Sequence, residues 1–325
     1  MHALERGDER GVALVVVLGL VALLSAWAVQ AAVEDELSLR RAENLKLSTH
    51  AWMGAKSGVE LAKHVLNEDK GDVDSLDEIW AAKGGAFPVD DGMVYLSIND
   101  ANRFYNLNDL IDDSGVVRAR EALLAKRLFR AVEVPEALVD AVVDWIDADA
   151  SVHGVDGAED SAYFAYDYRV RNAPFDRLEE LLLVKGMTRE YWLALKEVVT
   201  TLPSAKEPLK INLNSAKKEL LAALFPKATD SDIDLIISSR ESVPYVKIEE
   251  AIGIQNEYKW AAGVDRSRLS VSSDHFIIHS KSEFGRAWWG EEVMVKRTAK
   301  GISTLYRQKL AWDQLRLFDK GEEET

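Results

Sequence analysis

The chain of 325 residues contains no cysteine. This absence excludes thiol catalysis, disulfide bonds and zinc sites built on cysteine ligands. Basic side chains are scarce relative to acidic ones, 40 against 55, which gives a net charge of −15 at pH 7. Such a balance argues against a nucleic-acid-binding protein, because lysine and arginine contacts to phosphate supply most of the non-specific affinity for nucleic acids.

The sequence signatures of catalysis are also missing. No glycine-rich phosphate-binding loop is present, and Ser272 to Asp274 lie outside any nucleophile-elbow pattern. His275 and His279 are four residues apart in a strand-like segment without the H-E-x-x-H pattern of a zinc protease, so we interpret them as core or surface residues. The sequence therefore predicts a protein that is not an enzyme and has no catalytic residues.

The N-terminal region contains the long apolar segment of the chain. Residues 12–32 carry no charged side chain, and a helix of that length measures roughly 30 Å, the thickness of a bilayer core. A helical pattern without proline continues to Leu66, which predicts one helix over 12–67 with a transmembrane part at 12–32. This membrane part includes Val16, Leu20 and Leu24. A cleaved secretion signal is the alternative.

The residues that flank this segment indicate its orientation and processing. Arg6 and Arg10 precede it and acidic residues follow it, so the positive-inside rule places the N-terminus in the cytoplasm. A short polar leader (1–11) that ends in Gly11 resembles the leaders of type IV pilins and pseudopilins. The resemblance implies that prepilin peptidase cleaves after Gly11 and that Val12 is methylated. Val16 stands at the fifth mature position, where this class usually has a glutamate.

The middle of the chain contains a duplicated helical pattern. The tripeptide Asn-Leu-Asn begins at Asn106 and again at Asn212, and a proline–aromatic pair follows at Pro174 and at Pro244. We predict two helical repeats, 106–208 and 209–265. They resemble helix-hairpin-helix or SAM-like modules, but their hairpins have too many acids and too few glycines to grip phosphate. A membrane-anchored DNA-binding receptor is therefore the alternative function, and packing is the preferred use.

The first repeat also contains an acidic loop. Asp144 to Tyr168 combines seven carboxylates with two glycines and several aromatic residues. A high density of oxygen ligands suits Ca²⁺, which takes six to eight of them. The alternatives are a solvated acidic loop and the site of a metal-dependent hydrolase. Aromatic residues favour a packed loop, in which carboxylates repel one another unless a cation or Arg169 and Arg171 join them. The predicted metal ligands are Asp147, Asp149, Asp156, Glu159 and Asp160, with His153 a weaker choice.

The C-terminal part changes from helical to alternating periodicity. After Asp265 apolar and polar side chains alternate, and turn candidates occur at Phe284–Gly285 and Lys300–Gly301. We predict three antiparallel strands in 266–317. An earlier strand over Met93–Asp100, from the first part of the head (68–105), would join their sheet. The N-terminal helix would pack over this sheet. Residues 318–325 form a tail.

These motifs occur in an order that resembles the minor pseudopilin K family of type II secretion systems (general secretion pathway protein K). The resemblance rests on the glycine-ended leader, the apolar helix without the glutamate, DWIDAD with GAEDSAYF, PFDRLEELLLVKGM and INLNSAKKELLAAL. It implies an α+β fold with a long transmembrane helix and a pilin-like α/β head that has an antiparallel sheet, interrupted by a large all-helical insertion of two repeats.

The same resemblance implies a place in the cell. The protein would be a single-pass inner-membrane protein with a periplasmic globular part, at the tip of the pseudopilus. Its partners would be minor pseudopilins I and J, the major pseudopilin and prepilin peptidase, with no nucleic acid. A structural Ca²⁺ in the acidic loop is also implied.

Overall fold

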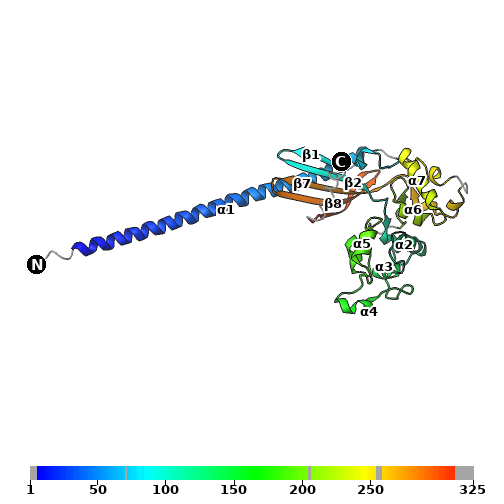
Figure 1. The fold of residues 1–325 in the computed structure, drawn as a ribbon, viewed down its shortest axis with the longest axis horizontal. Helices are drawn as coiled ribbons and strands as arrows, with labels where there is room; N and C mark the ends of the chain where they lie inside the picture. The colour runs from blue at the N-terminus through cyan, green and yellow to red at the C-terminus, as the bar shows by residue number, and fades with distance from the viewer. Residues whose placement is uncertain (1–5, 70–71, 83, 204–205, 254–257, 312–325) are drawn as a thin grey trace.

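A single long helix projects from the globular part of the molecule (Figure 1). The computed structural model describes residues 6–69, 72–82, 84–203, 206–253 and 258–311. Helix α1 (Arg6–Glu68) has 63 residues and is therefore roughly 95 Å long. It confirms the single helix predicted over 12–67 and begins earlier, within the predicted leader. The predicted tail, 318–325, lies outside the described residues.

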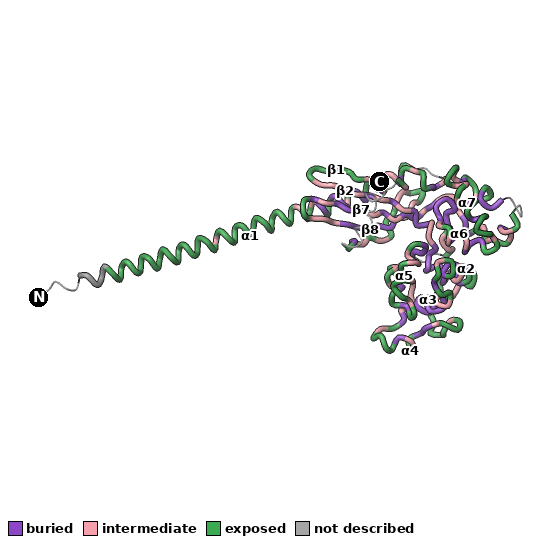
Figure 2. Tube along the Cα trace, in the orientation of Figure 1, coloured by how far each residue is buried: buried purple, intermediate pink, exposed green. Residues whose placement is uncertain are grey.

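The two halves of α1 have different surroundings. From Gly11 onward its N-terminal half is almost entirely exposed, as Figure 2 shows, and in the described chain α1 is the one helix long and apolar enough to cross a membrane. Its C-terminal half buries one stripe, which consists of Ala51, Ala55, Val59, Ala62 and Leu66. Steps of three and four residues place these side chains on one helical face, which therefore forms the packing surface.

The stripe packs on a five-stranded antiparallel sheet with the order β1-β2-β7-β8-β9. Its strands are β1 (Gly85–Val89), β2 (Gly92–Asp100), β7 (His275–Phe284), β8 (Ala287–Thr298) and β9 (Gly301–Lys309). The predicted strand at 93–100, the three C-terminal strands and both turns are confirmed, whereas β1 was missed. Gly54 lets the helix approach the sheet, because a Cβ there would lie 3.0 Å from the ring of Phe284.

The core of this two-layer head is apolar and lies between the helix and the sheet. Val59 and Leu66 of α1 meet Ile98 of β2 and Phe276 of β7, all of them buried. Trp80, in the short 3-10 helix η1 (Ile79–Ala81), closes the core and contacts the Phe276 ring edge-on, with ring centroids 5.2 Å apart. Alternation along β2 and β7 thus turns one face of the sheet toward α1.

A helical insertion occupies the chain between β2 and β7 (Figure 1). Its first part contains η2 (Leu107–Leu110), α2 (Ala119–Ala131), α3 (Leu138–Ile146), α4 (Asp160–Tyr163), η3 (Phe164–Tyr166), η4 (Leu178–Leu183) and α5 (Arg189–Leu195). Its second part contains α6 (Lys218–Leu224), α7 (Asp230–Ser242), α8 (Ile248–Ile252), η5 (Lys259–Ala261) and η6 (Arg266–Arg268). The two parts share one hydrophobic core, which is separate from the core of the head.

The same contacts recur at both Asn-Leu-Asn tripeptides. Each begins at a two-residue parallel strand pair, β3 (Tyr105–Asn106) with β4 (Val199–Thr200), and β5 (Ile211–Asn212) with β6 (Leu269–Ser270). The third residue of each tripeptide then binds the backbone of the aromatic residue after the proline. Asn108 accepts from the N–H of Phe175 and donates to its carbonyl, and Asn214 does the same with Tyr245. The recurrence agrees with a duplicated module.

One predicted helix differs in type between the copies. The segment after Pro174 is the 3-10 helix η4, whereas the corresponding α8 is α-helical. Both begin with a glutamate at the third position, Glu180 or Glu250, that accepts from the backbone N–H at the helix start. Both segments are short, six residues in η4 and five in α8, so the two copies differ in the spacing of only a few backbone hydrogen bonds.

Buried polar groups attach the insertion to the head. Asn212 donates through Nδ2 to Asp100 Oδ2 at 3.1 Å, to Ser273 Oγ at 2.8 Å and to the carbonyl of Asp74 at 3.0 Å. Asn102 donates to the carbonyl of Lys210 at 2.8 Å. Because buried polar groups cost free energy when unpaired, this network fixes the second repeat against the end of the sheet.

Replacing Asn108 by leucine is expected to lower the free energy of unfolding by about 3 kcal/mol. The change leaves the N–H and carbonyl of Phe175 and the carbonyl of Leu202 without their buried partner. Urea unfolding of the detergent-solubilised chain measures the effect. The control is Asn67→Leu, at an exposed position of α1, which should change stability by under about 0.5 kcal/mol. A loss below about 1 kcal/mol for Asn108→Leu would contradict the role given to this contact.

Candidate functional site

Three carboxylates of the acidic loop converge in the first repeat. Asp147, Asp149 and Glu159 each offer one oxygen, and these oxygens lie within 4.8 Å of one another. Asp147 ends α3, and Glu159 immediately precedes α4. The intervening loop therefore folds back so that the end of one helix and the start of the next meet at these three side chains.

Several carboxylate oxygens at this point are buried without a hydrogen-bond partner among the described residues. They are Asp144 Oδ2, Asp147 Oδ1 and Glu159 Oε1. Asp147 is only 2 % exposed and Glu159 only 7 %. An ionised carboxylate buried without a partner is strongly unfavourable, and three together are more so. The donor set thus fits a hard divalent cation that binds oxygen.

The electrostatics of the cluster agree with this fit. Burial, followed by the charges of Asp149, Asp144 and Glu159, raises the pKa of Asp147 to about 7. Burial also raises the pKa of Asp144 and of Glu159 above their usual range. These shifts show that the cluster resists holding its full negative charge alone, which is the condition that a bound cation relieves.

The arginine that the sequence offered as an alternative partner lies elsewhere. Arg171 forms ion pairs with Asp176 at 2.5 Å and with Glu180 at 2.7 Å, outside the acidic cluster. Arg169 is exposed. Arg171 therefore stabilises the start of η4 through these ion pairs and does not neutralise Asp147 and Glu159.

Two glycines allow the loop backbone to lie against the carboxylates of α3. A Cβ on Gly157 would collide with the carboxylate of Asp144, and a Cβ on Gly154 would collide with that of Asp140. Gly154 also has a φ of +65°, which favours glycine. Asp144 Oδ1 accepts from the backbone N–H of His153 at 2.8 Å, so His153 contributes its backbone to the loop.

The structure does not bring all five predicted ligands together. Asp160 accepts through Oδ1 from the N–H of Val170 at 3.1 Å, and Asp156 lines a separate pocket beside Lys126 and Asp140. Neither belongs to the group of Asp147, Asp149 and Glu159. Asp144 was not among the predicted ligands, although its position three residues before Asp147 placed it on the same helical face.

The expected packing of the aromatic residues is right for part of the loop. Trp145 and Tyr163 are buried, with ring centroids 5.5 Å apart in an edge-to-face contact, and Tyr168 packs 5.6 Å from Tyr163. Phe164 and Tyr166 are instead exposed, Phe164 by 82 %. Trp145, Tyr163 and Tyr168 therefore pack in the core beside the carboxylates. Phe164 and Tyr166 lie in the short helix η3 and face the solvent.

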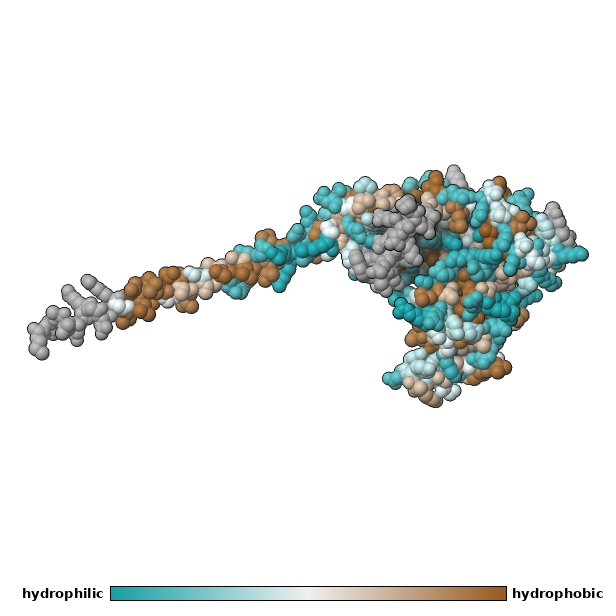
Figure 3. All heavy atoms as spheres, viewed as in Figure 1, coloured by the Kyte–Doolittle hydropathy of each residue, from teal (hydrophilic) through white to brown (hydrophobic). Residues whose placement is uncertain are grey.

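The residues predicted for processing and membrane insertion lie on the exposed half of α1. Gly11 and Val12 are helical and exposed, and so are Val16, Leu20 and Leu24. Figure 3 shows this part of the helix as a nearly continuous hydrophobic surface. A fully exposed apolar helix is unfavourable in water, so this segment fits a single-pass membrane anchor.

The two strand histidines make structural contacts. His279 on β7 lies 2.7 Å from Glu292 Oε2 on β8, and Asn99 contacts its other ring nitrogen at 3.3 Å. His275 lies 2.6 Å from Asp274 Oδ1. Their neighbours are carboxylates and an amide within the sheet or directly before β7, which agrees with the structural interpretation of both residues.

The membrane-length helix, the antiparallel sheet packed on its second half and the helical insertion between β2 and β7 define a pseudopilin-like protein with an inserted domain. The fold agrees with a solved structure titled the GspK-GspI-GspJ complex from the enterotoxigenic Escherichia coli type 2 secretion system. The similarity has a TM-score of 0.69 and 22 % identity, and it covers 83 % of this chain and 99 % of that one.

Sequence comparisons give the family. Two profiles described as type II secretion system (T2SS), protein K match residues 103–204 and 211–272. The type II secretion system protein K of Pseudomonas aeruginosa is 34 % identical over 235 residues, 68 % of this chain and 69 % of that protein. The protein of the same name from Klebsiella pneumoniae is 28 % identical over 92 % of this chain and 96 % of its own length. The chain belongs to the type II secretion system protein K family, as its sequence motifs predicted.

Proposed function

We propose that this protein is a non-enzymatic minor pseudopilin that forms the tip of the type II secretion pseudopilus and is needed for pseudopilus assembly and protein export across the outer membrane. Its family membership and its fold support this role, and they do not support the alternative of a DNA-binding receptor. The mechanism that we propose is geometric and not chemical.

The observation that carries the proposal is the position of the insertion. Figure 1 shows the helical insertion beyond the head, at the end opposite to the apolar half of α1. Subunits of a fibre stack along their N-terminal helices, so the next subunit above would meet the insertion. The buried network around Asn212 holds the second repeat in this place. The bulk of the insertion would therefore permit only the terminal position.

The partners follow from the same reasoning. The similar solved structure contains GspK with GspI and GspJ, and we propose that minor pseudopilins I and J bind this chain in the same way. The major pseudopilin would continue the fibre below them.

The helical repeats would pack against neighbouring parts of the protein and would not bind DNA. Their duplicated asparagine contacts support a helix-hairpin-helix or SAM-like architecture.

The N-terminus would act in the inner membrane. Prepilin peptidase would cleave after Gly11, and Val12 would become the methylated first residue, with the leader in the cytoplasm and the head in the periplasm. Val16 would replace the glutamate that in this class neutralises the terminal amine of a neighbouring subunit. A tip subunit has no neighbour above it to neutralise, so an apolar residue is compatible with this position.

Calcium would have a structural role in the insertion. We assign its ligands to Asp147, Asp149 and Glu159, with Asp144 completing the negative set. When bound, the ion would neutralise these carboxylates and tie the end of α3 to the start of α4. No step of a reaction is assigned to it.

Deleting the gene is expected to stop export by the type II system and to leave the exported proteins in the periplasm, because the tip cannot assemble. Wild-type protein supplied in trans should restore export. Enzyme activity of a known exported protein in medium and periplasm measures the result. Normal export in the deletion strain would contradict the proposed role.

A further inference from the structure

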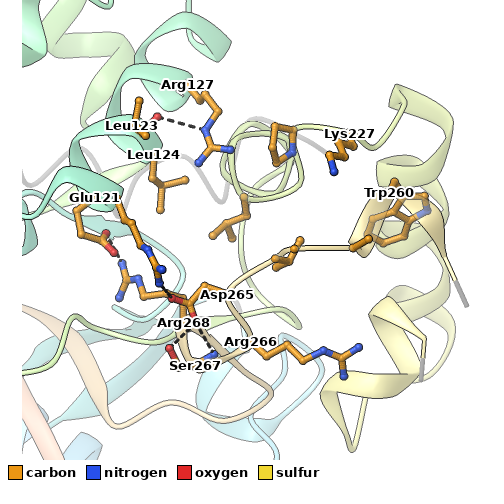
Figure 4. A pocket seen from close by; sticks show the side chains of 16 residues that line it. Glu121, Leu123, Leu124, Arg127, Lys227, Trp260, Asp265, Arg266, Ser267 and Arg268 are labelled. Atoms are coloured by element: carbon orange, nitrogen blue, oxygen red, sulfur yellow. Dashed lines mark hydrogen bonds and ion pairs between the residues drawn. The ribbon is translucent and has the colours of Figure 1, made fainter. Parts of the chain in front are cut away.

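A large pocket lies where the two repeats of the insertion meet. Its volume is about 750 Å³, and α2, α6 and the segment 260–268 line it (Figure 4). One wall therefore belongs to the first repeat and the other to the second. The acidic cluster of the loop is not part of its lining.

The charge of this pocket is opposite to that of the whole protein. Five basic residues line it, Arg120, Arg127, Lys227, Arg266 and Arg268, against two acidic ones, Glu121 and Asp265. In the chain as a whole acids outnumber bases, 55 to 40. A concentration of positive charge in a protein of net charge −15 attracts anionic groups to this pocket.

Both acids of the pocket are already paired. Glu121 forms a buried ion pair with Arg268 at 3.0 Å, and Asp265 lies 3.5 Å from Arg120. Arg266 points away from the pocket centre in Figure 4 and contacts Glu249 at 3.4 Å. These pairs leave the remaining two basic residues of the lining to face the cavity.

Arg127 and Lys227 reach into the pocket from its two sides, as Figure 4 shows. Arg127 is half-buried, and its Nε donates to the carbonyl of Leu123 at 3.2 Å. Within the described ranges neither residue forms an ion pair. Burial lowers the pKa of Arg127, with the nearby Glu121 opposing the change. A partly desolvated guanidinium without a carboxylate partner is suited to bind one from outside.

An apolar floor lies beside these cations. Leu124 and Leu224 are buried at the base of the pocket. The half-buried Trp260 is held by two rings, edge-on by Phe225 at 5.3 Å and stacked by Tyr258 at 5.5 Å. A small inorganic anion would leave this floor uncovered, whereas a peptide that carries both carboxylates and an apolar side chain would use both features.

We propose that this pocket binds an acidic peptide segment of a partner protein. Carboxylates of the segment pair with Arg127 and Lys227, and an apolar side chain covers Leu124, Leu224 and Trp260. The assignment depends on neither calcium nor the tip position, because it rests on the pocket alone.

The test uses fluorescence anisotropy with the full chain in detergent micelles. The probe is a fluorescein-labelled, glutamate-rich dodecapeptide with one central leucine. We expect saturable binding that Arg127→Gln with Lys227→Gln weakens at least tenfold. The control, Lys185→Gln with Arg189→Gln, removes the same charge at exposed positions outside the pocket and should stay within twofold of wild type. Replacing the leucine of the probe by glycine should weaken binding severalfold.

Three results would overturn the proposal. The first is no saturable binding of the dodecapeptide by the wild-type chain. The second is an equal loss of affinity in the control, which would show attraction by overall charge alone. The third is equally tight binding of a DNA oligonucleotide with the same dependence on Arg127 and Lys227, which would show a general polyanion site.

Discussion

Chelating calcium with EGTA is expected to lower the melting temperature of the detergent-solubilised chain by about 10 °C. A ligand present at 1,000 times its dissociation constant stabilises the folded state by about 4 kcal/mol. Each kcal/mol shifts the melting temperature by roughly 2–4 °C in a unit of the size of the helical insertion, 106–265, which has its own core. The physical cause is the set of buried carboxylates at Asp147 and Glu159, which repel one another without a cation. Differential scanning fluorimetry with and without EGTA measures the shift.

A neutralised variant makes this prediction specific. Asp147→Asn with Glu159→Gln keeps the shape of both side chains and removes their charge. This variant should melt at the same temperature with or without calcium, and in EGTA it should be at least as stable as wild type, because the repulsion is gone. The control, Asp113→Asn with Glu190→Gln, changes two exposed acids and should keep the response to EGTA. A wild-type protein that is indifferent to EGTA would contradict the calcium proposal.

The same stabilisation should depend on pH. The pKa of Asp147 is raised from 3.8 to about 7 in the folded protein without metal, so the folded state binds this proton more tightly than the unfolded state does. Without calcium, the contribution of this carboxyl group to stability is therefore fully present below about pH 4 and is lost as the pH rises through about 7. Calcium needs the ionised carboxylates, so the difference between melting temperatures with and without calcium should grow from pH 5 to pH 7 and then level off.

Replacing Gly11 by alanine is expected to block maturation and, with it, export. The leader would stay attached, and the helix could not enter the fibre core with a free, methylated N-terminus. The substitution has no cost in the fold itself, because a Cβ on Gly11 would meet no atom within 4 Å. Mass spectrometry of the membrane fraction should show the precursor, whereas the wild-type protein should begin at a methylated Val12.

A second glycine of the same helix provides the control. Gly19 lies in the apolar half of α1, and a Cβ there would also meet nothing within 4 Å. Gly19→Ala should therefore be processed and should restore export like wild type. Normal processing of Gly11→Ala, or equal failure of both variants, would refute the assignment of the cleavage site.

Much of the head was predictable because its pattern is local. Alternating apolar residues defined β7, β8 and β9, and the absence of proline defined α1 as one helix. Strand β1 was missed because Gly85 and Pro88 are typical of loops. Proline is tolerated there because β1 is an edge strand that needs ladder bonds on one side only.

The candidate metal centre was predictable in composition but not in detail. The density of acids indicated a cation site, yet only folding shows that Asp160 bonds to Val170 and that Asp144 faces Asp147. The basic pocket was not predictable, because Arg127 and Lys227 lie 100 positions apart in different repeats. Local sequence patterns do not reveal which residues from different repeats line the same pocket.

Each part of the chain would have its own task in the pseudopilus. In the proposed role, the apolar half of α1 would anchor the subunit and enter the fibre, and the insertion would close its end. The contacts of Asn212 with Asp100 and Ser273 join the second repeat to the head. A bound calcium ion would make the first repeat more rigid, because it would join the end of α3 to the start of α4.

The central claim is that this subunit caps a pseudopilus together with other minor pseudopilins. The most direct test is co-expression of the full chain with minor pseudopilins I and J of the same secretion system, followed by native mass spectrometry of the detergent-solubilised complex. We expect one stable complex that contains a single copy of each of the three proteins. Isolation of this chain alone, or a complex in which another pilin-like subunit covers the insertion, would contradict it.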